Sequence, residues 1–413
     1  MIVDSKAYSG VCGCGKSHEM QTKLAVIESG CLKKLDDYMQ QYGLKGFRTA
    51  VYDENTYHAL GMEPIAAEQT IVLDPKDLHA NEKGVEMVMR QLSPQTKVLI
   101  AVGAGTIHDI TRYCAYIQGI PFVSCPTAAS VDGFCSSVAA MTWEGAKKTL
   151  TAVPPEIVVA DLNVISQAPM RLSRSGFGDM IGKWIALTDW RIGRILKNEF
   201  YCDRIANMTE QATKAVMESA KGIAKGQVQA YETLTYGLIL SGLAMQLMGN
   251  SRPASGAEHH ISHIIEMEPD GLAVHSDGLH GEKVGVATVY AAEEYHRLKK
   301  LPADAWGDYP AITEEEIYKV FGDRLTGQIT AENAKDSAAG ITGESLREHW
   351  EEIRTQLEKI PEAATLKKLY DELDVMHTLK ELGVPEEKLP ELLDASPLVR
   401  NRLTLMRLRR CLL

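Results

Sequence analysis

Three residues that lie far apart in the sequence have the side chains needed to hold a catalytic metal ion. Asp179 lies in the motif GFGDMIGK, His259 in the motif AEHHISH and His280 in the motif LHG. A carboxylate with two imidazoles suits Zn²⁺, and it also suits Ni²⁺, Fe²⁺ and Mn²⁺. Three protein ligands leave one coordination position for a substrate oxygen. These residues therefore predict a metal site that is open to substrate.

The elements expected at these positions bring only some of the residues together. Asp179 is expected at the opening of a helix, and His280 in a loop or at a helix start. His263 follows His259 by four residues, so both lie on one face of a helix. Eighty residues separate Asp179 from His259. Spacing alone leaves open whether these two meet, and whether His263 is also a ligand.

The residues around the histidines narrow the kind of site. Glu258 precedes His259 and His260, so the H-E-x-x-H motif of a metalloprotease is absent. We expect His260 and His275 to be structural or to face solvent.

A glycine-rich turn after residues 98–102 has the features of a nucleotide site. Gly103 and Gly105 let the backbone approach a pyrophosphate, and the helix that follows points its first N–H groups at that anion. Position 108 is His, so the complete G-x-G-x-x-G motif is absent, and a tight turn that needs glycine for steric reasons alone remains an alternative. The candidate cofactor residues here are Gly103, Ala104, Gly105, Thr106 and Ile107.

A second loop, CPTAASVDGF, follows the strand expected at 121–124. Its small residues and hydroxyls suit close contact with a cofactor, and Thr127 and Ser130 can donate hydrogen bonds to it. Asp132 is a candidate acceptor for a substrate hydroxyl, with an Asx turn as the alternative. Asp53, just after the strand 47–52, can accept from a nicotinamide ribose or simply form a turn.

The first 165 residues alternate short β-rich runs with helical stretches. The expected strands are 47–52, 70–73, 98–102, 121–124 and 156–160, with helices around 82–92 and 109–118 between some of them. Runs rich in Val and Ile are typical of strands buried on both faces of a parallel sheet. The alternation predicts a doubly wound α/β domain of the Rossmann type.

The rest of the chain reads as helical. Helical periodicity covers 203–248, 284–300, 313–322, 345–358 and 365–381. A chain of 413 residues is too long for one compact core. We therefore predict an α/β nucleotide-binding domain at 1–165 and an all-α metal- and substrate-binding domain at 166–413.

The composition excludes several classes of protein. A net charge of −11 argues against nucleic acid or an anionic membrane as a partner. No apolar run approaches the length of a membrane span, and the first residues lack the apolar core of a signal peptide. We therefore expect a cytoplasmic protein.

The eight cysteines are scattered and do not resemble a disulfide framework. Cys12, Cys14 and His18 have metal-ligand spacing, but Cys31 is the one further cysteine nearby. The sequence favours a turn at the end of an N-terminal hairpin over a metal site.

Five motifs in order resemble the glycerol-1-phosphate dehydrogenases of the bacterial AraM type. They are GAGTIHD, PTAASVDGF, GFGDMIGK, SGAEHHISH and LHGEKVG, and the resemblance spans roughly residues 45–290. That group is part of the superfamily of 3-dehydroquinate synthase, glycerol dehydrogenase and iron-containing alcohol dehydrogenases. The resemblance implies a Rossmann-like domain followed by a helical domain, NAD(H) or NADP(H), one divalent metal (Zn or Ni, with Fe less favoured), and a homodimer.

The resemblance also implies roles for single residues. Asp179, His259 and His280 match the three metal ligands, while His263 matches a histidine at the substrate. Asp132 matches a substrate contact. The two cofactor loops match Gly103 to Ile107 and, in the second, Thr127, Ala128, Ala129, Ser130 and Ser136.

Lys183 favours a phosphate ester as the expected substrate. Iron-type alcohol dehydrogenases resemble this layout but carry a histidine at this place, four residues after the aspartate ligand. An ammonium group does not bind a metal, but it pairs with a phosphate.

The implied reaction is reversible reduction of dihydroxyacetone phosphate to sn-glycerol 1-phosphate, with His263 relaying the alcohol proton. The alternatives are a glycerol dehydrogenase-type enzyme acting on an unphosphorylated polyol, a dehydroquinate synthase-like lyase, and a nucleotide-binding regulator without chemistry.

Overall fold

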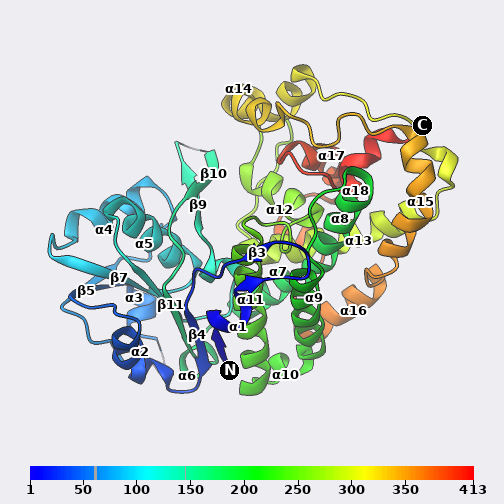
Figure 1. Cartoon of the computed structure of the whole chain (residues 1–413). Helices are drawn as coiled ribbons and strands as arrows, with labels where there is room; N and C mark the ends of the chain where they lie inside the picture. The colour runs from blue at the N-terminus through cyan, green and yellow to red at the C-terminus, as the bar shows by residue number, and fades with distance from the viewer. Residues whose placement is uncertain (60–62, 145) are drawn as a thin grey trace. The chain divides into compact units, whose positions relative to one another are not determined.

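The computed structural model describes residues 1–59, 63–144 and 146–413 (Figure 1). By their internal contacts these residues divide into two units. Unit 1 comprises Met1–Met180 and Lys214–Asn250, and unit 2 comprises Ile181–Thr213 and Ser251–Leu413. The domain boundary proposed from sequence, between residues 165 and 166, stays a prediction.

Unit 1 is built on a seven-stranded sheet with the order β1-β4-β11-β8-β7-β5-β6. The strands pair in parallel except β1, which is antiparallel to β4. The bounds are β1 (Ile2–Asp4), β4 (Leu24–Glu28), β5 (Phe47–Asp53), β6 (Gln69–Leu73), β7 (Thr96–Gly103), β8 (Phe122–Pro126) and β11 (Ile157–Asp161). The five predicted strands are all present, and β1 and β4 are additions that the sequence analysis missed.

Apolar side chains pack on both faces of this sheet. One core cluster joins the sheet to Leu35 and Met39 of α2, and the other joins it to Val88 of α4 and Ile110 of α5. The helices of unit 1 are α1 (Ser5–Tyr8), α2 (Leu35–Gln41), α3 (Glu54–Tyr57), α4 (Glu82–Gln91), α5 (Gly105–Gln118), α6 (Leu162–Ile165), α10 (Ala220–Ala224), α11 (Val228–Met248) and most of α7 (Met170–Ile181). Burial on both faces is what a doubly wound α/β fold requires, and this prediction is confirmed.

Two antiparallel hairpins complete unit 1. One pairs β9 (Val138–Trp143) with β10 (Ala146–Thr151), and the other pairs β2 (Gly10–Val11) with β3 (Ser17–His18). The second hairpin carries Cys12 and Cys14 in its turn, as predicted.

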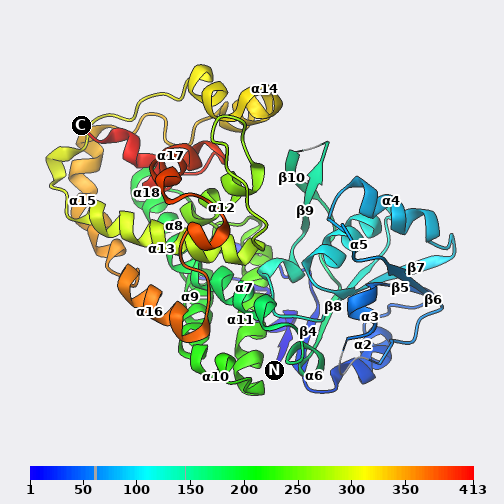
Figure 2. The ribbon, with the colours of Figure 1, turned by 180° about the vertical axis from the view of Figure 1, so that it is seen from behind.

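Unit 2 is helical within the described residues (Figure 2). Its helices are α8 (Lys183–Lys197), most of α9 (Asp203–Glu218), α12 (Ala257–Met267), α13 (His280–Lys299), α14 (Glu314–Asn333), α15 (Gly343–Leu357), α16 (Ala363–Leu373), α17 (Leu389–Ala395) and α18 (Leu405–Leu408). Helix α13 is buried along most of its length and packs against α8, α12, α15, α16 and α18. It is therefore the central element of this unit.

Two predicted helical stretches are interrupted. The stretch 203–248 is three helices, and Gly226, with φ of 68°, lies in the break before α11. The stretch 365–381 ends as a helix at Leu373, because Asp374 adopts a left-handed conformation. None of the helices in the described residues is both long enough and apolar enough to cross a membrane.

Candidate active site

The first cofactor loop joins β7 to α5 in unit 1. Gly103 ends the strand, Ala104 is the N-cap and Gly105 begins the helix. A Cβ on Gly103 would lie 2.6 Å from Cβ of Ile107, so only glycine lets the strand and the helix pack this closely. Ala104 makes no side-chain cap and the first turn has no acidic residue. The N–H groups of this turn lack intrahelical acceptors, so this end of α5 is suited to an anion.

His108 occupies the place of the third glycine and has a structural task that the sequence analysis missed. Its Nδ1 donates to Ala104 O (3.0 Å) and its Nε2 accepts from the hydroxyl of Ser124 (2.8 Å). Burial lowers the pKa of His108 to about 3, so the ring is neutral near pH 7. The neutral ring links the start of α5 to β8 through these two hydrogen bonds. In the sequence, Ser124 in the expected strand 121–124 is the feature that could have indicated this contact.

The second cofactor loop is buried and is joined to the first. Thr127 N donates to Gly103 O (3.0 Å), and Thr127, Ala128, Ala129 and Ser130 are all buried. Among the described residues, Oγ of Ser130 has no hydrogen-bond partner. A buried hydroxyl of this kind is costly unless a partner reaches it, which suits a loop that contacts a ligand.

Two other candidate cofactor residues use their side chains locally. Asp53 is the N-cap of α3, where its carboxylate accepts from Thr56 N (2.8 Å). Ser136 Oγ donates to Val138 O (2.9 Å) and accepts from Val138 N (3.0 Å). The turn described as the alternative for Asp53 is thus formed, and its contact with a ribose stays a prediction.

Asp179 lies within α7 and not at its opening, so that prediction is wrong. The helix begins at Met170, after Pro169, and Asp179 is in its last turn. Gly176 is interior to α7 because a Cβ there would lie 2.1 Å from Ala129 O. The glycines before Asp179 therefore allow close packing on the second cofactor loop and do not mark a helix start.

The structure brings Asp179 and Asp132 together within unit 1. Asp132 N donates to Oδ2 of the fully buried Asp179 (3.0 Å). The Asp132 carboxylate in turn accepts from Ser241 Oγ of α11 (2.9 Å). This hydrogen bond satisfies one oxygen of a carboxylate that burial alone would disfavour.

Three histidines of unit 2 form a cluster. His259 and His263 lie one turn apart on α12, and His280 is the first residue of α13. The ring centroid of His280 lies 5.4 Å from that of His259 and 5.9 Å from that of His263. His275 is exposed and pairs with Glu268, as expected from sequence. His260 is buried, and among the described residues neither of its ring nitrogens has a hydrogen-bond partner.

A carboxylate holds Nδ1 of each predicted histidine ligand. Nδ1 of His259 donates to Glu258 Oε1 (2.6 Å), and Nδ1 of His280 donates to Glu266 Oε1 (2.8 Å). In the neutral form of each ring, Nε2 is then the nitrogen with a lone pair for a metal. Carboxylate partners of this kind orient metal-binding imidazoles and raise their basicity. Both glutamates lie close in sequence to a candidate histidine, but no residue pattern marked them as its partners.

A buried lysine opposes part of the effect of burial on Glu258. Burial raises the pKa of Glu258 to about 8, while the hydrogen bond from Gly256 N and the charge of Lys183 act in the opposite direction. Lys183 is itself fully buried at the start of α8. The ammonium therefore has a structural use in unit 2 beside its predicted use as a phosphate contact.

Asp189 fixes the start of the histidine-bearing helix. Its carboxylate accepts from Ala257 N (2.9 Å), from Leu405 N (2.8 Å) and from the hydroxyl of Tyr295 (2.8 Å). Burial raises the pKa of Asp189 to about 7. This residue holds α12, α13 and α18 in register, and no local sequence pattern marked it.

The ring of His263 is neutral near pH 7 and can accept a proton. Burial of the ring and the neighbouring imidazoles of His259 and His280 hold the pKa of His263 well below its usual range, although Glu266 opposes them. Ligand atoms of His263, Glu266 and His280 lie within 4.8 Å of one another. These three residues are therefore a second possible metal set inside unit 2.

Known proteins resemble the chain in sequence. Residues 26–169 match the family model described as iron-containing alcohol dehydrogenase. Glycerol-1-phosphate dehydrogenase (NAD(P)+) of Bacillus licheniformis is 35% identical over 362 residues, which cover 84% of this chain and 88% of that protein. The protein of the same name from Halalkalibacterium halodurans is 32% identical over 420 residues, covering 98% of this chain and 97% of that protein.

Solved structures resemble the chain in fold. A probable glycerol dehydrogenase from Sinorhizobium meliloti 1021 superposes with a TM-score of 0.55 at 20% identity, covering 81% of this chain and 97% of that one. At this identity the likeness concerns the fold alone.

Proposed function

The chain belongs to the glycerol-1-phosphate dehydrogenase family, and from this premise we propose that it reversibly reduces dihydroxyacetone phosphate to sn-glycerol 1-phosphate as a metal-dependent NAD(P)-linked oxidoreductase. The family resemblance drawn from five ordered motifs is confirmed by relatives that are 35% and 32% identical over most of their length. One observation carries the proposal: two imidazoles of unit 2 each have Nδ1 held by a glutamate, as metal ligands do.

We propose Asp179, His259 and His280 as the three ligands of one divalent ion. The donor set fits such an ion, because it offers a fully buried carboxylate and two oriented imidazole nitrogens. When bound, the metal supplies Lewis-acid polarisation of a carbonyl oxygen, and the nicotinamide supplies the hydride. Glu266 is assigned to orienting His280 and not to the metal, because its Oε1 already accepts from that ring.

His263 is proposed to carry the alcohol proton. It lies one helical turn from His259, and its low pKa keeps Nε2 or Nδ1 available to accept a proton at neutral pH. In the direction of reduction the ring acts as a relay, passing to the nascent alcohol a proton that it takes up from solvent. This assignment makes His263 a catalytic residue and leaves the metal to the other two histidines.

The cofactor is proposed to bind along the two loops of unit 1. The first turn of α5 offers backbone N–H groups to the pyrophosphate, and Gly103 admits it closely. The hydroxyl of Ser130, which has no hydrogen-bond partner among the described residues, is proposed to bond the cofactor. Asp53, with one carboxylate oxygen on its cap, is proposed to accept from a ribose hydroxyl with the other.

The substrate is proposed to be a three-carbon phosphate ester. Lys183 supplies the cation for its phosphate, and Asp132 accepts from its hydroxyl.

A substrate comparison tests the proposal. Metal-stripped enzyme is re-supplied with Zn²⁺ or Ni²⁺, and NADH and NADPH oxidation are followed with dihydroxyacetone phosphate and with dihydroxyacetone. We expect turnover with the phosphate ester only after metal is restored. Preference for dihydroxyacetone would establish the glycerol dehydrogenase-type reaction instead. Absence of steady cofactor turnover with either ketone would exclude both and favour a lyase that uses NAD without consuming it.

We also propose that the chain works in the cytoplasm as a homodimer. Sedimentation equilibrium tests the oligomer: the proposal requires the mass of two 45.4 kDa chains, and a mass of one chain would exclude it.

A further inference from the structure

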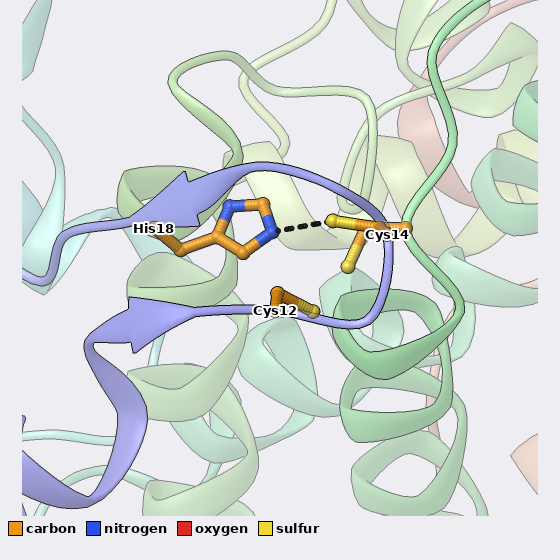
Figure 3. Close-up of side chains that lie close together, drawn as sticks. Cys12, Cys14 and His18 are labelled. Atoms are coloured by element: carbon orange, nitrogen blue, oxygen red, sulfur yellow. Dashed lines mark hydrogen bonds between the residues drawn. The ribbon is translucent and has the colours of Figure 1, made fainter.

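A second cluster of metal-binding side chains lies in the N-terminal hairpin of unit 1. Cys12 and Cys14 are in the turn between β2 and β3, and His18 ends β3. Figure 3 shows the three side chains directed toward one another across the turn. Their ligand atoms lie within 4.8 Å of one another, and Cys14 Sγ is 3.1 Å from His18 Nε2.

The imidazole of this cluster is already oriented for a ligand. His18 is buried, and its Nδ1 donates to the backbone oxygen of Leu247 at the end of α11 (2.8 Å). The proton on Nδ1 makes Nε2 the unprotonated nitrogen, and Nε2 faces Cys14 (Figure 3). A metal-bound histidine typically donates its other ring N–H to a carbonyl or a carboxylate.

The turn fixes the two sulfur atoms through its backbone. Cys12 N donates to Lys16 O (2.9 Å), and Gly15 N donates to Cys12 O (3.0 Å). Gly15 has a φ of 87°, which favours glycine at this place. The thiols are thus presented by a tight loop whose shape does not depend on a metal.

We propose that Cys12, Cys14 and His18 bind a structural Zn²⁺ ion, separate from the catalytic metal. Zinc takes thiolate and imidazole ligands at about 2.3 and 2.0 Å in tetrahedral geometry, which places such ligand atoms about 3.5 Å apart. The 3.1 Å between Cys14 Sγ and His18 Nε2 is reached from that value by small side-chain rotations. Cys31, the further cysteine considered from sequence, lies in the core under the sheet and is not a ligand.

The place of the site assigns it a stabilising role. The segment after His18 is tied to Gln246 of α11, whose Oε1 accepts from Gln21 N and Thr22 N (both 3.0 Å). Gln246 Nε2 donates to Cys135 O (2.5 Å), in the short helix η2 (Asp132–Cys135). A metal that fixes the hairpin therefore also fixes the end of α11 and the segment that carries Asp132.

Metal content of purified full-length protein tests the site, with the metal alone as the probe. We expect about two zinc ions per chain in the wild type after saturation and about one in Cys14→Ser, in which the hairpin has lost a thiolate ligand. The control Ser17→Ala changes an exposed neighbour in β3 and should keep both ions. In Cys14→Ser we also expect a lower thermal midpoint, with kcat at low temperature within about twofold of the wild type.

A second measurement keeps the test decisive if Cys14→Ser does not fold. Cobalt-substituted wild type should show a thiolate-to-metal charge-transfer band, which the catalytic set cannot produce because it contains no sulfur. Equal zinc in Cys14→Ser and wild type, no charge-transfer band, or a Cys12–Cys14 disulfide in the purified protein would each overturn the site. These outcomes leave the dehydrogenase reaction untouched, whereas failure of that reaction leaves the zinc count of the hairpin unchanged.

Discussion

The histidine cluster of unit 2 and the histidine-containing hairpin of unit 1 differ in which groups accept hydrogen bonds from their imidazoles. In unit 2, carboxylates of Glu258 and Glu266 accept from His259 and His280, whereas in the hairpin a neutral backbone oxygen accepts from His18. When it is ionised, a carboxylate partner adds negative charge to a ligand set that has a single anionic member, while the hairpin already has two thiols. This difference is consistent with a catalytic Lewis-acid site in unit 2 and a structural site in the hairpin.

His259→Ala should have the largest effect on activity. It tests whether the histidine cluster of unit 2 holds the catalytic metal. We expect kcat/KM to fall by at least ~10³-fold, because the Lewis acid contributes several kcal/mol to the transition state. Metal analysis should show the loss of one ion while the hairpin ion stays. His275→Ala, an exposed histidine of the same unit, should change neither value.

A specific outcome would relocate the catalytic metal. If His259→Ala keeps its metal, the set of His263, Glu266 and His280, whose ligand atoms lie within 4.8 Å of one another, becomes the site. The corresponding loss would then appear in His263→Ala.

His263→Ala separates proton transfer from metal binding. We expect kcat to fall by roughly 10²–10⁴-fold, the usual contribution of a positioned acid–base group. Metal content should stay near that of the wild type, and added imidazole should restore part of the activity. Loss of the metal in this variant would refute the role given to His263.

Local and non-local parts of the structure were not equally predictable. Five of the seven strands of the sheet, the turn at Gly103 and the hairpin turn at Cys12 follow from residue patterns a few positions long, and the structure has them. The sequence predicts Asp179 at a helix opening, whereas the structure has it in the last turn of α7. Gly176 is instead required inside α7 by Ala129, a contact between residues 47 positions apart.

The partners of the site residues were harder to predict than the site residues themselves. Glu258 adjoins His259, but its use depends on burial and on the charge of Lys183. Asp189 accepts hydrogen bonds from Leu405 N and from the hydroxyl of Tyr295. These residues are far apart in the sequence, and no periodic pattern connects them. A pairing of this kind is decided by the packing of whole helices, so it becomes visible only in the folded unit.

Glu258→Gln sharpens the comparison by making the partner of His259 neutral, as the partner of His18 is. The amide oxygen still accepts from Nδ1, so orientation is kept and charge is lost. We expect a ~10–100-fold weaker affinity for the catalytic metal, measured by competition with a chelator above pH 8, because burial raises the pKa of Glu258 to about 8. Glu268→Gln, an exposed acid after the same helix, is the control. Unchanged affinity would mean that orientation alone, and not charge, accounts for the carboxylate.

Lys183→Met should give the smallest effect. It tests whether the ammonium group binds the substrate phosphate or serves only to stabilise the charge of Glu258. If the ammonium binds the substrate phosphate, KM for dihydroxyacetone phosphate should rise by about 10-fold or more, as expected for loss of a charged hydrogen bond, while KM for dihydroxyacetone stays constant. Lys183→Arg keeps the charge and should recover part of that loss. Lys197→Met, in the last turn of the same helix, should leave both KM values unchanged.

If Lys183→Met instead loses metal and raises KM for both ketones equally, the ammonium serves Glu258. The phosphate preference of the enzyme must then come from other residues.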